Sequence, residues 1–485
     1  MAKPISAFVP YQGDHFTRRT IDQLLSSNLV YTVYLLTNQD VPNDISECNR
    51  LKVGSLFSSD TMRLVAKKCS SPYALFIMHN EPIEFGQHAI ERLLSVAENS
   101  GSGLVYSDYY DLKEGKRIAH PVIDYQPGSI RDDFNFGPIV LLNSAALNHS
   151  VLKTDKESFN FAGFYSARLA VSRKWPVCRI SEFLYAKAES DVRKSGERLF
   201  DYVDPRNRAA QIEMELAATR HLKKIGAYLK PGFKTVNLAK GRFACEASII
   251  IPVKNRVRTI REAVESALKQ KADFPFNIIV VDNHSADGTT DILGSLAQKD
   301  ARVLHVIPQR EDLGIGGCWN EAIQHEKCGQ FAVQLDSDDL YKDETTLHRI
   351  VDVFKREKCA MVIGSYQMVN FALEEIPPGI VDHREWTADS GPNNALRING
   401  LGAPRAFYTP VIRKVRFPNV NYGEDYAVGL AISREYRIGR IYDPIYLCRR
   451  WEGNSDADLD IATQNLHDAY KDKLRTLEIM ARAHL

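Results

Sequence analysis

Apolar runs and helical patterns alternate along the second half of the chain, beginning near residue 247. The run Ser248-Ile249-Ile250-Ile251 is apolar and β-branched, which is typical of a strand covered on both faces. Apolar residues then recur at helical spacing between Thr259 and Gln270, and Thr259 with Glu262 fits a capping box. The alternation continues through strands at 277–281, 302–307 and 330–335 and helices near 289–298 and 317–325. This order predicts a parallel sheet with helices on both faces.

The first part of the chain repeats this order with different side chains. Four segments correspond in turn: Ile5–Pro10 to 248–252, Val33–Asn38 to 278–283, Leu75–Glu81 to 332–338, and Arg168–Arg173 to Gly429–Arg434. His79 and Asp336 are 257 positions apart, and Arg173 and Arg434 are 261 positions apart. Nearly constant offsets over distant segments predict an internal duplication, with chance likeness between short apolar strands as the alternative.

The pattern therefore predicts an α/β fold made of two tandem Rossmann-like domains, each with a mostly parallel sheet. We expect a first domain over residues 1–205, a helical connector over 206–243, a second domain over 244–460 and a C-terminal helix over 461–485. Within the connector, Arg208–Lys230 has the apolar spacing of one helix, which Pro231-Gly232 ends. We expect the C-terminal helix to pack on the second domain.

Composition and charge narrow the class of protein. The chain has 485 residues, of which 44% are hydrophobic and 25% charged, as in soluble globular proteins, and its formal net charge of +1 argues against a nucleic-acid partner. No apolar stretch is long enough for a membrane-spanning helix, although peripheral membrane contact stays open. The first residues lack a signal-peptide pattern, and the eight cysteines include no C-x-x-C pair, so neither a disulfide framework nor a zinc site is expected. We therefore expect a cytoplasmic protein.

Polar side chains cluster where the predicted strands end. Asp336-Ser337-Asp338-Asp339 follows a buried strand, and two carboxylates two residues apart can bind a divalent cation through their oxygens. Such a cation can neutralise the charge on a departing diphosphate. A capped turn that opens the next helix is the alternative. Because ligands bind at the carboxyl ends of strands in open α/β sheets, we favour a binding site here.

Three further segments have both a chemical and a structural interpretation. Asp282 ends a strand, where its carboxylate can accept hydrogen bonds from a base or a ribose, but turn chemistry explains Asp282–Thr289 equally well. Leu313–Gly317 is similar to a phosphate-binding loop without matching a P-loop, and close backbone packing is the alternative. Glu424 and Asp425 open a helix whose dipole would keep both carboxylates ionised, so Asp425 is a candidate general base and helix capping is the alternative.

Taken in order, five segments resemble a family 2 glycosyltransferase: Ser248–Arg256, Val280–Thr290, Asp312–Asn320, Gln334–Asp339 and Gly423–Asp425. The resemblance is strong over residues 247–455 and weak over 5–190. It implies the GT-A fold for both domains, a nucleotide-diphosphate sugar as donor and a divalent cation, Mn²⁺ or Mg²⁺. It also implies inverting transfer to a carbohydrate or another hydroxyl acceptor, as in polysaccharide biosynthesis.

The resemblance also implies roles for single residues. Asp338 would be the principal metal ligand, and Asp336 would contact the ribose or the metal. Asp425 would take the proton of the acceptor hydroxyl, with Glu424 helping to orient it. The donor would further contact Pro252, Asn255, Arg256, Asp282, Asp312, Gly314, Arg449, Arg450 and Trp451. Gly400–Arg405 lies where the family places loops on the acceptor side.

Two positions depart from the family pattern. Trp451 stands where the family often has a histidine that completes the metal or diphosphate site. Arg449 or Arg450 can neutralise the diphosphate instead, since guanidinium groups match phosphate oxygens, or can pair with surface acids. Asp312 stands where the family commonly has asparagine.

The first half lacks the residues on which this chemistry depends. It has His79-Asn80-Glu81 at the metal motif, Phe164 opposite Asp425 and Thr37 opposite Asp282. Since a general base alone contributes roughly 10²–10⁴-fold in rate, we expect a degenerate domain that binds acceptor or serves as a scaffold. A metal held in an altered way by His79 and Glu81 is the alternative.

Two other functions stay open from the sequence. A nucleotidyltransferase that makes the activated sugar would also use aspartates on an α/β sheet, but Pro252–Arg256 lacks the glycine-rich loop of that class. A non-catalytic carbohydrate-binding or assembly protein is supported by the altered position of Trp451. The sequence leaves the acceptor open: it is compatible with a glycan, a lipid-linked intermediate or a small metabolite.

Overall fold

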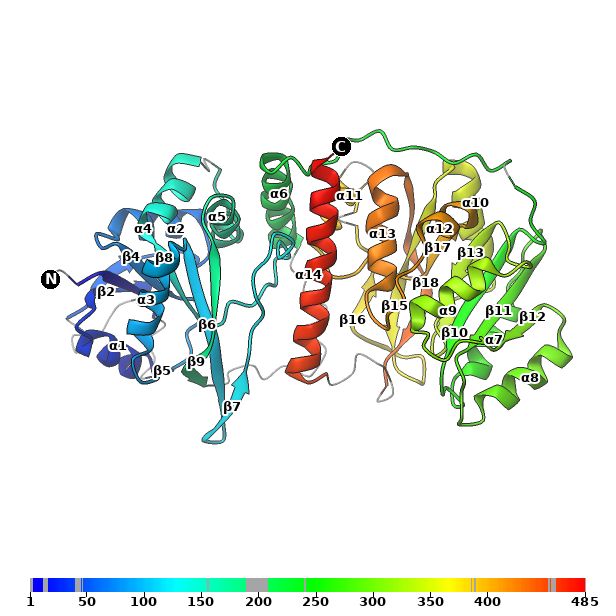
Figure 1. The fold of residues 1–485 in the computed structure, drawn as a ribbon, viewed down its shortest axis with the longest axis horizontal. Helices are drawn as coiled ribbons and strands as arrows, with labels where there is room; N and C mark the ends of the chain where they lie inside the picture. Colours follow the sequence, from blue (N-terminus) through cyan, green and yellow to red (C-terminus); the bar gives the residue numbers. More distant parts are fainter. Residues whose placement is uncertain are drawn as a thin grey trace. The chain divides into compact units, whose positions relative to one another are not determined.

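The computed structural model describes residues 3–11, 16–39, 45, 47–154, 157–188, 208–239, 241–384, 386–387, 390–451, 454 and 459–484. Two compact units make up the chain (Figure 1). The first unit consists of Met1–Lys194, Asn207–Tyr228 and Leu459–Leu485, and the second contains Leu229–Asp458. The predicted boundary between residues 205 and 206 lies outside the described residues.

The second unit is built on one mixed sheet. Its strands follow the order β12 (Val303–Val306), β11 (Phe276–Asp282), β10 (Ala247–Val253), β13 (Phe331–Gln334), β17 (Arg405–Tyr408), β15 (Met361–Val369), β18 (Ile438–Arg449) and β14 (Leu340–Tyr341), with β16 (Glu375–Val381) beside β15. The neighbours from β12 to β13 are parallel, and β17 runs antiparallel to both β13 and β15. Ile249, Ile250 and Ile251 are fully buried, because both faces of β10 are covered.

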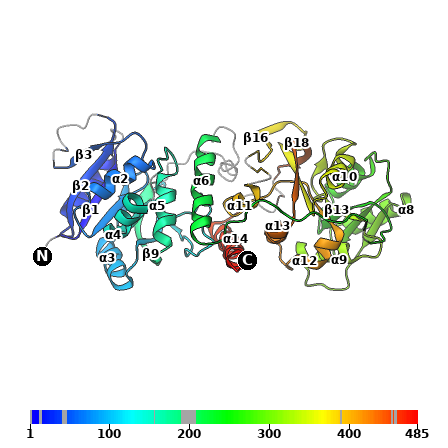
Figure 2. The same cartoon turned by 90° about the horizontal axis from the view of Figure 1, so that it is seen from above.

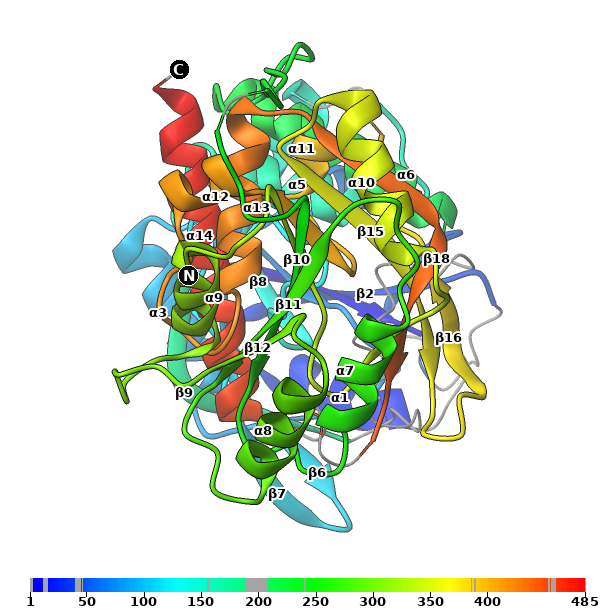
Figure 3. The ribbon, with the colours of Figure 1, turned by 90° about the vertical axis from the view of Figure 1, so that its right-hand side faces the viewer.

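Helices follow the strands on both sides of this sheet. They are α7 (Ile260–Leu268), α8 (Thr289–Lys299), α9 (Ile315–Gln324), α10 (Thr346–Glu357), α11 (Gly391–Asn394), α12 (Thr409–Val415) and α13 (Glu424–Glu435). α7 and α9 lie on opposite sides of β10 and β11 (Figure 3), and α10 packs on β15 and β18. This layering brings the ends of β10 and β13 to one edge of the sheet.

The first unit repeats the strand order of the second. Its sheet runs β3 (Asn49–Lys52), β2 (Val30–Thr37), β1 (Ile5–Pro10), β4 (Tyr73–Ile77), β8 (Ile139–Asn143), β6 (Leu104–Lys113), β9 (Val177–Ala188) and β5 (Ile83–Phe85), with β7 (Lys116–His120) beside β6. Its helices are α1 (Phe16–Ser26), α2 (Ser59–Lys68), α3 (Ala89–Ser100), α4 (Ser144–Asn148), the π-helix η2 (His149–Thr154), α5 (Gly163–Ser172), α6 (Arg208–Lys224) and α14 (Ile461–Ala483). Each strand has a counterpart at the same place in the second sheet, which confirms the predicted α/β architecture with two related domains.

Strand register refines the correspondence between the units. Ile5 pairs with Tyr73 in the first sheet, and Ala247 pairs with Phe331 in the second. Tyr73 therefore corresponds to Phe331, one position away from the alignment predicted from the sequence. The structural counterparts of the acidic motif are consequently Met78 for Asp336, Asn80 for Asp338 and Glu81 for Asp339.

Two helices differ from their predictions. α6, which lies beside α5 (Figures 1 and 2), ends at Lys224 and not at Lys230, because Gly226 has a φ of 76° and the backbone N–H of Ala227 donates to Leu222 O over 2.9 Å.

The C-terminal helix α14 belongs to the first unit, so the expectation that it packs on the second domain is wrong. Asp472 is fully buried on α14 and accepts from Ser129 Oγ over 2.8 Å. Arg131 of the same unit lies 3.1 Å from Asp468 and 3.3 Å from Asp472. Because a buried carboxylate needs charged and hydrogen-bonded partners, these partners decide where the helix packs.

None of the helices in the described part of the chain combines the length and hydropathy that crossing a lipid bilayer requires.

Candidate active site

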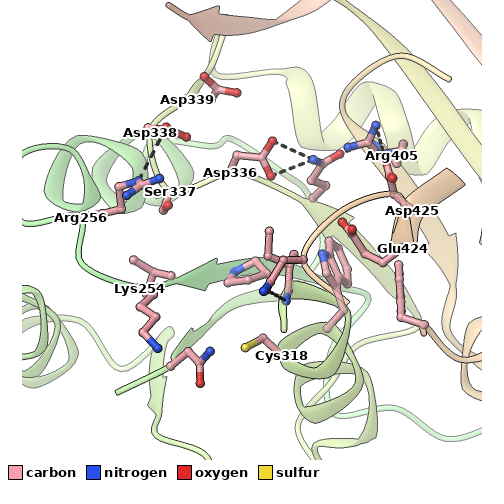
Figure 4. Close-up of a pocket in the computed structure, with 18 of the residues that line it drawn as sticks. Lys254, Arg256, Cys318, Asp336, Ser337, Asp338, Asp339, Arg405, Glu424 and Asp425 are labelled. Atoms are coloured by element: carbon pink, nitrogen blue, oxygen red, sulfur yellow. Dashed lines mark hydrogen bonds and ion pairs between the residues drawn. The ribbon is translucent and has the colours of Figure 1, made fainter. Parts of the chain in front are cut away.

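A pocket of about 360 Å³ opens at the edge of the second sheet where β10 and β13 end (Figure 4). The ends of these strands, the segment after β13, the start of α13 and the end of β18 all contribute to it. Of the predicted site residues, the pocket is lined by Pro252, Arg256, Asp336, Asp338, Glu424, Asp425 and Arg450. The structure thus brings together the acidic motif after β13 and the acidic pair that opens α13.

The acidic motif is held in a network of hydrogen bonds. Gln334 Nε2 donates to both carboxylate oxygens of Asp336, over 2.8 and 2.9 Å, and the backbone N–H of Asp336 donates to the Tyr446 hydroxyl over 3.0 Å. Burial raises the pKa of Asp336, although the nearby Arg405 guanidinium opposes this shift. Burial, with the charges of Asp338 and Asp336, raises the pKa of Asp339 well above its usual range.

Asp338 points toward hydrogen-bond donors. Its Oδ2 atom lies 3.3 Å from Asn454 Nδ2, 3.4 Å from Trp451 Nε1 and 3.8 Å from Arg256 Nε. Trp451 does not itself line the pocket, but its indole N–H reaches the carboxylate predicted to be the principal metal ligand. The residue that replaces the family's histidine therefore contacts Asp338 directly.

The acidic motif fits a cation that is bound partly by protein carboxylates and partly by oxygens of a substrate. Carboxylate oxygens are the ligands that Mg²⁺ and Mn²⁺ prefer, and Asp336 and Asp338 both line the pocket. Among the described residues no group of three or more His, Cys, Asp or Glu side chains is arranged to hold a metal ion. Mg²⁺ is commonly bound by one or two carboxylates together with phosphate oxygens, so the pair fits that arrangement and not a closed protein site.

The second acidic pair opens α13. Gly423 precedes it in the left-handed conformation, with a φ of 76°, so glycine suits this helix start. Asp425 Oδ2 lies 2.7 Å from Arg405 Nη1, and its Oδ1 accepts from the backbone N–H of Tyr426 over 2.7 Å. Burial and the charge of Asp425 raise the pKa of Glu424 to about 8. The expectation that the helix dipole keeps both carboxylates ionised is therefore wrong for Glu424, since desolvation outweighs the dipole.

Asp282 does not line the pocket. It is fully buried, and its oxygens accept from Ser285 N over 3.0 Å and from Thr290 Oγ1 over 2.6 Å. His305 Nε2 lies 3.2 Å from the same carboxylate. These hydrogen bonds outweigh the effect of burial and lower the pKa of Asp282. Asp282 thus ties the turn after β11 to β12, as the turn interpretation predicts.

Three other predicted donor contacts also lie outside the pocket lining. Asn255 accepts from Ala286 N over 2.8 Å and so braces the turn after β11. Asp312 is exposed and pairs with Arg310 at 2.6 Å. Gly314 donates through its backbone N–H to Asn419 Oδ1 over 2.7 Å, and a Cβ atom there would lie 2.6 Å from Val420. Close backbone packing therefore explains the glycine-rich segment.

The two late arginines separate in space. Arg449 is 1% exposed and does not line the pocket. Its Nε donates to the carbonyl of Asp338, its Nη1 pairs with Glu262, and its backbone N–H donates to Asp339 Oδ1 over 2.8 Å. Arg449 thus holds the acidic loop in shape, whereas Arg450 lines the pocket.

Sequence reasoning missed several residues of this pocket. Lys254, Asn283 and Asn454 line it without an individual role expected from the sequence, and Arg405 lines it after being expected only as the end of the acceptor-side segment Gly400–Arg405. Asn283 is 7% exposed and donates to Leu313 O over 2.8 Å, and its buried Oδ1 atom has no hydrogen-bond partner in the part of the chain that the structure describes. The signal for Asn283 was its place directly after Asp282 at the end of β11. For Arg405 the sequence indicated a place on the acceptor side but not its contacts with Gln334 and Asp425, which depend on the pairing of β13 with β17.

The same place in the first unit is apolar. Phe164 corresponds to Asp425 and lies 6.0 Å, ring to ring, from both Phe57 and Phe76 and 6.3 Å from Phe136. Phe164 is only 7% exposed. Aromatic side chains therefore fill the region that the acidic groups line in the second unit.

Residues 248–414 match the family model described as glycosyl transferase family 2. This match lies wholly within the second unit. The match agrees with the family predicted from the motifs. Asp336 and Asp338 of the pocket lie within the matched residues, whereas Glu424, Asp425 and Arg450 lie beyond them.

Known proteins resemble parts of the chain. TuaG of Bacillus subtilis strain 168, which carries the name of a teichuronic acid biosynthesis glycosyltransferase, is 31% identical over 122 residues, or 25% of this chain and 47% of TuaG. The poly(ribitol-phosphate) beta-glucosyltransferase of Bacillus spizizenii is 25% identical over 240 residues, or 48% of this chain and 36% of that protein. The chain thus spans less than half of the length of these two relatives. The structure of S. aureus TarS residues 1–349 with UDP-GlcNAc has a TM-score of 0.38 and 22% identity, covering 49% of this chain and 72% of that one.

Proposed function

We propose that the chain transfers a glycosyl group from a nucleotide-diphosphate sugar to a hydroxyl acceptor, with inversion at the anomeric carbon. The observation that carries this proposal is that Asp338 and Asp425 line one pocket of the second unit, whose residues 248–414 match the family 2 glycosyltransferase model. One carboxylate belongs to the loop after β13 and the other to the first turn of α13. Such a pocket can hold a phosphorylated donor and an alcohol side by side.

We propose that cationic side chains bind the donor's diphosphate. Lys254, Arg256 and Arg450 line the pocket, Arg256 lies 3.8 Å from Asp338, and guanidinium groups match phosphate oxygens in geometry. Asn283 is better placed than Asp282 to meet the nucleobase, because its buried Oδ1 atom has no hydrogen-bond partner among the described residues. An N–H group of a base would satisfy this acceptor, and an unsatisfied buried acceptor costs roughly 1–3 kcal/mol.

Asp338 and Asp336 are the residues that would hold a divalent cation, Mn²⁺ or Mg²⁺, together with the donor's phosphates. When bound, such a cation neutralises the charge that develops on the leaving diphosphate. Arg449 and Asn454 keep the loop that carries Asp338 in position through the hydrogen bonds described above.

Asp425 is proposed as the general base. It accepts the proton of the acceptor hydroxyl, whose oxygen forms a bond to the anomeric carbon while the bond from that carbon to the diphosphate oxygen breaks. The nucleoside diphosphate leaves with the bonding electrons. Glu424, with a pKa of about 8, holds its proton at neutral pH and so adds no second negative charge beside the base.

The first unit is proposed to be a degenerate transferase domain that binds acceptor or serves as a scaffold. Phe164, Met78 and Asn80 stand where the second unit has Asp425, Asp336 and Asp338, so the carboxylates of the reaction are missing from it. The printed names of the two relatives refer to teichuronic acid and poly(ribitol-phosphate). On that basis we propose an acceptor from polysaccharide biosynthesis, and from the cysteine pattern a cytoplasmic location.

The test is product analysis with a panel of nucleotide sugars, Mn²⁺ or Mg²⁺ and glycan acceptors. The proposal predicts release of nucleoside diphosphate and a product of inverted anomeric configuration. Asp425→Asn, which keeps the shape of the side chain, should slow this transfer by about 10²–10⁴-fold. Release of pyrophosphate would instead identify a nucleotidyltransferase. An Asp425→Asn rate near that of the parent would refute the proposal that Asp425 is the general base.

A further inference from the structure

Arg405 connects the two acidic parts of the pocket. It begins β17, and its Nη1 atom lies 2.7 Å from Asp425 Oδ2 and 3.0 Å from Gly402 O. Its backbone N–H donates over 3.0 Å to Gln334 Oε1, whose amide nitrogen in turn donates to Asp336. Asp336, Gln334, Arg405 and Asp425 thus form one continuous chain of contacts. Figure 4 shows Asp336, Arg405 and Asp425 along the pocket wall. We call this chain of contacts the brace.

The brace contains an ion pair between the Arg405 guanidinium and the Asp425 carboxylate. The Arg405 side chain is 17% exposed and the Asp425 side chain 25% exposed, so water screens their attraction only in part. Burial alone would lower the pKa of Arg405, but the charges of Asp425 and Asp336 raise it. The Arg405 guanidinium thus places a positive charge beside Asp425 and near Asp336 and Glu424.

The first unit shows what the fold requires at these positions. Phe76 corresponds to Gln334 and pairs directly with Val140, which corresponds to Arg405. Met78 and Phe164 stand in the places of Asp336 and Asp425. All four members of the brace are apolar there, yet β4 and β8 pair antiparallel just as β13 and β17 do. The pairing of these strands therefore does not need the brace, which points to a role in the pocket.

We propose that Arg405 is a positioning residue, which fixes the direction of the Asp425 carboxylate toward the acceptor hydroxyl. Arg405 acts through Asp425 and need not touch the substrate. This inference rests on the proposed function, in which Asp425 is the general base. Holding a base within hydrogen-bonding reach of its proton is worth a large factor in rate, since a displacement of about 1 Å can cost 10²-fold.

The test compares Arg405→Met and Arg405→Lys in the full chain. Arg405→Met should lower the kcat of transfer by about 10²-fold while the KM for the donor stays within about threefold of the parent. Arg405→Lys should recover most of the loss, because a single ammonium can reach the one carboxylate oxygen that Arg405 contacts. Arg413→Met is the matched control: Arg413 donates to the carbonyl of Ile323 outside the pocket, and its loss should leave kcat unchanged.

A double variant separates a local effect from a general one. If Arg405 acts through Asp425, adding Arg405→Met to Asp425→Asn should slow transfer by less than about threefold more. Gln334→Leu, which removes the amide link of the brace, should lower kcat in the same direction and provides a second test if Arg405→Met does not fold.

Three results would overturn the inference: an Arg405→Met kcat within twofold of the parent, a loss expressed mainly in donor KM, or full additivity in the double variant. A parent-like rate for Asp425→Asn would instead remove the proposed function on which the inference rests.

Discussion

The two units share one strand order and differ in what lies at the sheet's edge. In the second unit, carboxylates and cations line the pocket, and burial raises the pKa of Asp336, Asp339 and Glu424. In the first unit, Phe57, Phe76, Phe136 and Phe164 pack together at the corresponding place. The difference shows that the sheet depends on its apolar strands, whereas the acidic groups are an addition that the fold tolerates.

The aromatic side chains of the first unit and the acidic side chains of the second also differ in their effect on stability. Aromatic pairs contribute roughly 0.5–1.5 kcal/mol each beyond the burial of their surface, whereas buried carboxyl groups are desolvated at a cost. The second unit therefore accepts a less stable arrangement at this edge than the first unit has. Such a trade-off between stability and activity is expected where a pocket must bind charged substrates.

The largest expected effect comes from placing a charge in the aromatic cluster of the first unit. Phe164→Asp should lower the free energy of unfolding by about 3–5 kcal/mol, because it removes three ring contacts and buries an unpaired carboxylate. Denaturant unfolding followed by tryptophan fluorescence measures this loss. Phe164→Leu is the matched control and should cost much less, since it keeps an apolar side chain. A Phe164→Asp variant as stable as Phe164→Leu would show that the cluster is not packed as described.

A smaller effect is expected at Glu424, and it depends on pH. The pKa of this carboxyl is about 8 in the folded chain and near 4.5 in the unfolded chain. As the pH rises from 4.5 to 8, the unfolded state loses this proton first, so the folded state loses stability over that window. Glu424→Gln removes the dependence, and should make the chain more stable than the parent by about 1–4 kcal/mol at pH 8.5 and equally stable at pH 4.5. Equal stability of the two proteins at both pH values would contradict the raised pKa.

The smallest effect is expected at Trp451. Its indole N–H lies 3.4 Å from Asp338 Oδ2, which is a long hydrogen bond. Trp451→Phe keeps an aromatic ring against Phe371 and removes only the donor, so the donor KM should change by less than about tenfold. Steady-state kinetics over a range of donor concentrations measures this. A loss of more than 10²-fold would mean that the indole has a role in the reaction beyond its contact with Asp338.

The sequence predicted the elements better than it predicted the partners of single side chains. Asp338 was expected at the site because ligands bind at the carboxyl ends of strands, and Asp425 because the segment Gly423–Asp425 resembles the family pattern; both line the pocket. Asp282 obeys the same rule, yet its carboxylate is taken up by Ser285, Thr290 and His305. A strand-end aspartate looks the same in sequence whether it faces a ligand or closes a turn.

The packing of α14 could not be predicted for a related reason. Its buried face includes Asp472 and Arg475, both fully buried, so the usual apolar periodicity does not reveal which surface it covers. Its partners, Ser129 and Arg131, lie more than 300 residues earlier in the chain. Likewise, the correspondence between Asn80 and Asp338 needed the strand register, since short apolar strands allow a shift of one residue.

The most direct test of the central claim, that the chemistry belongs to the pocket of the second unit, is a matched pair of substitutions at corresponding positions. Transfer rates are measured for Asp338→Ala and for Asn80→Ala, each corrected for the folded fraction. The account predicts that Asp338→Ala loses more than about 10²-fold in kcat/KM, since it removes a carboxylate from the pocket, while Asn80→Ala stays within about twofold of the parent. A loss of similar size in both variants, or a parent-like rate for Asp338→Ala, would contradict it.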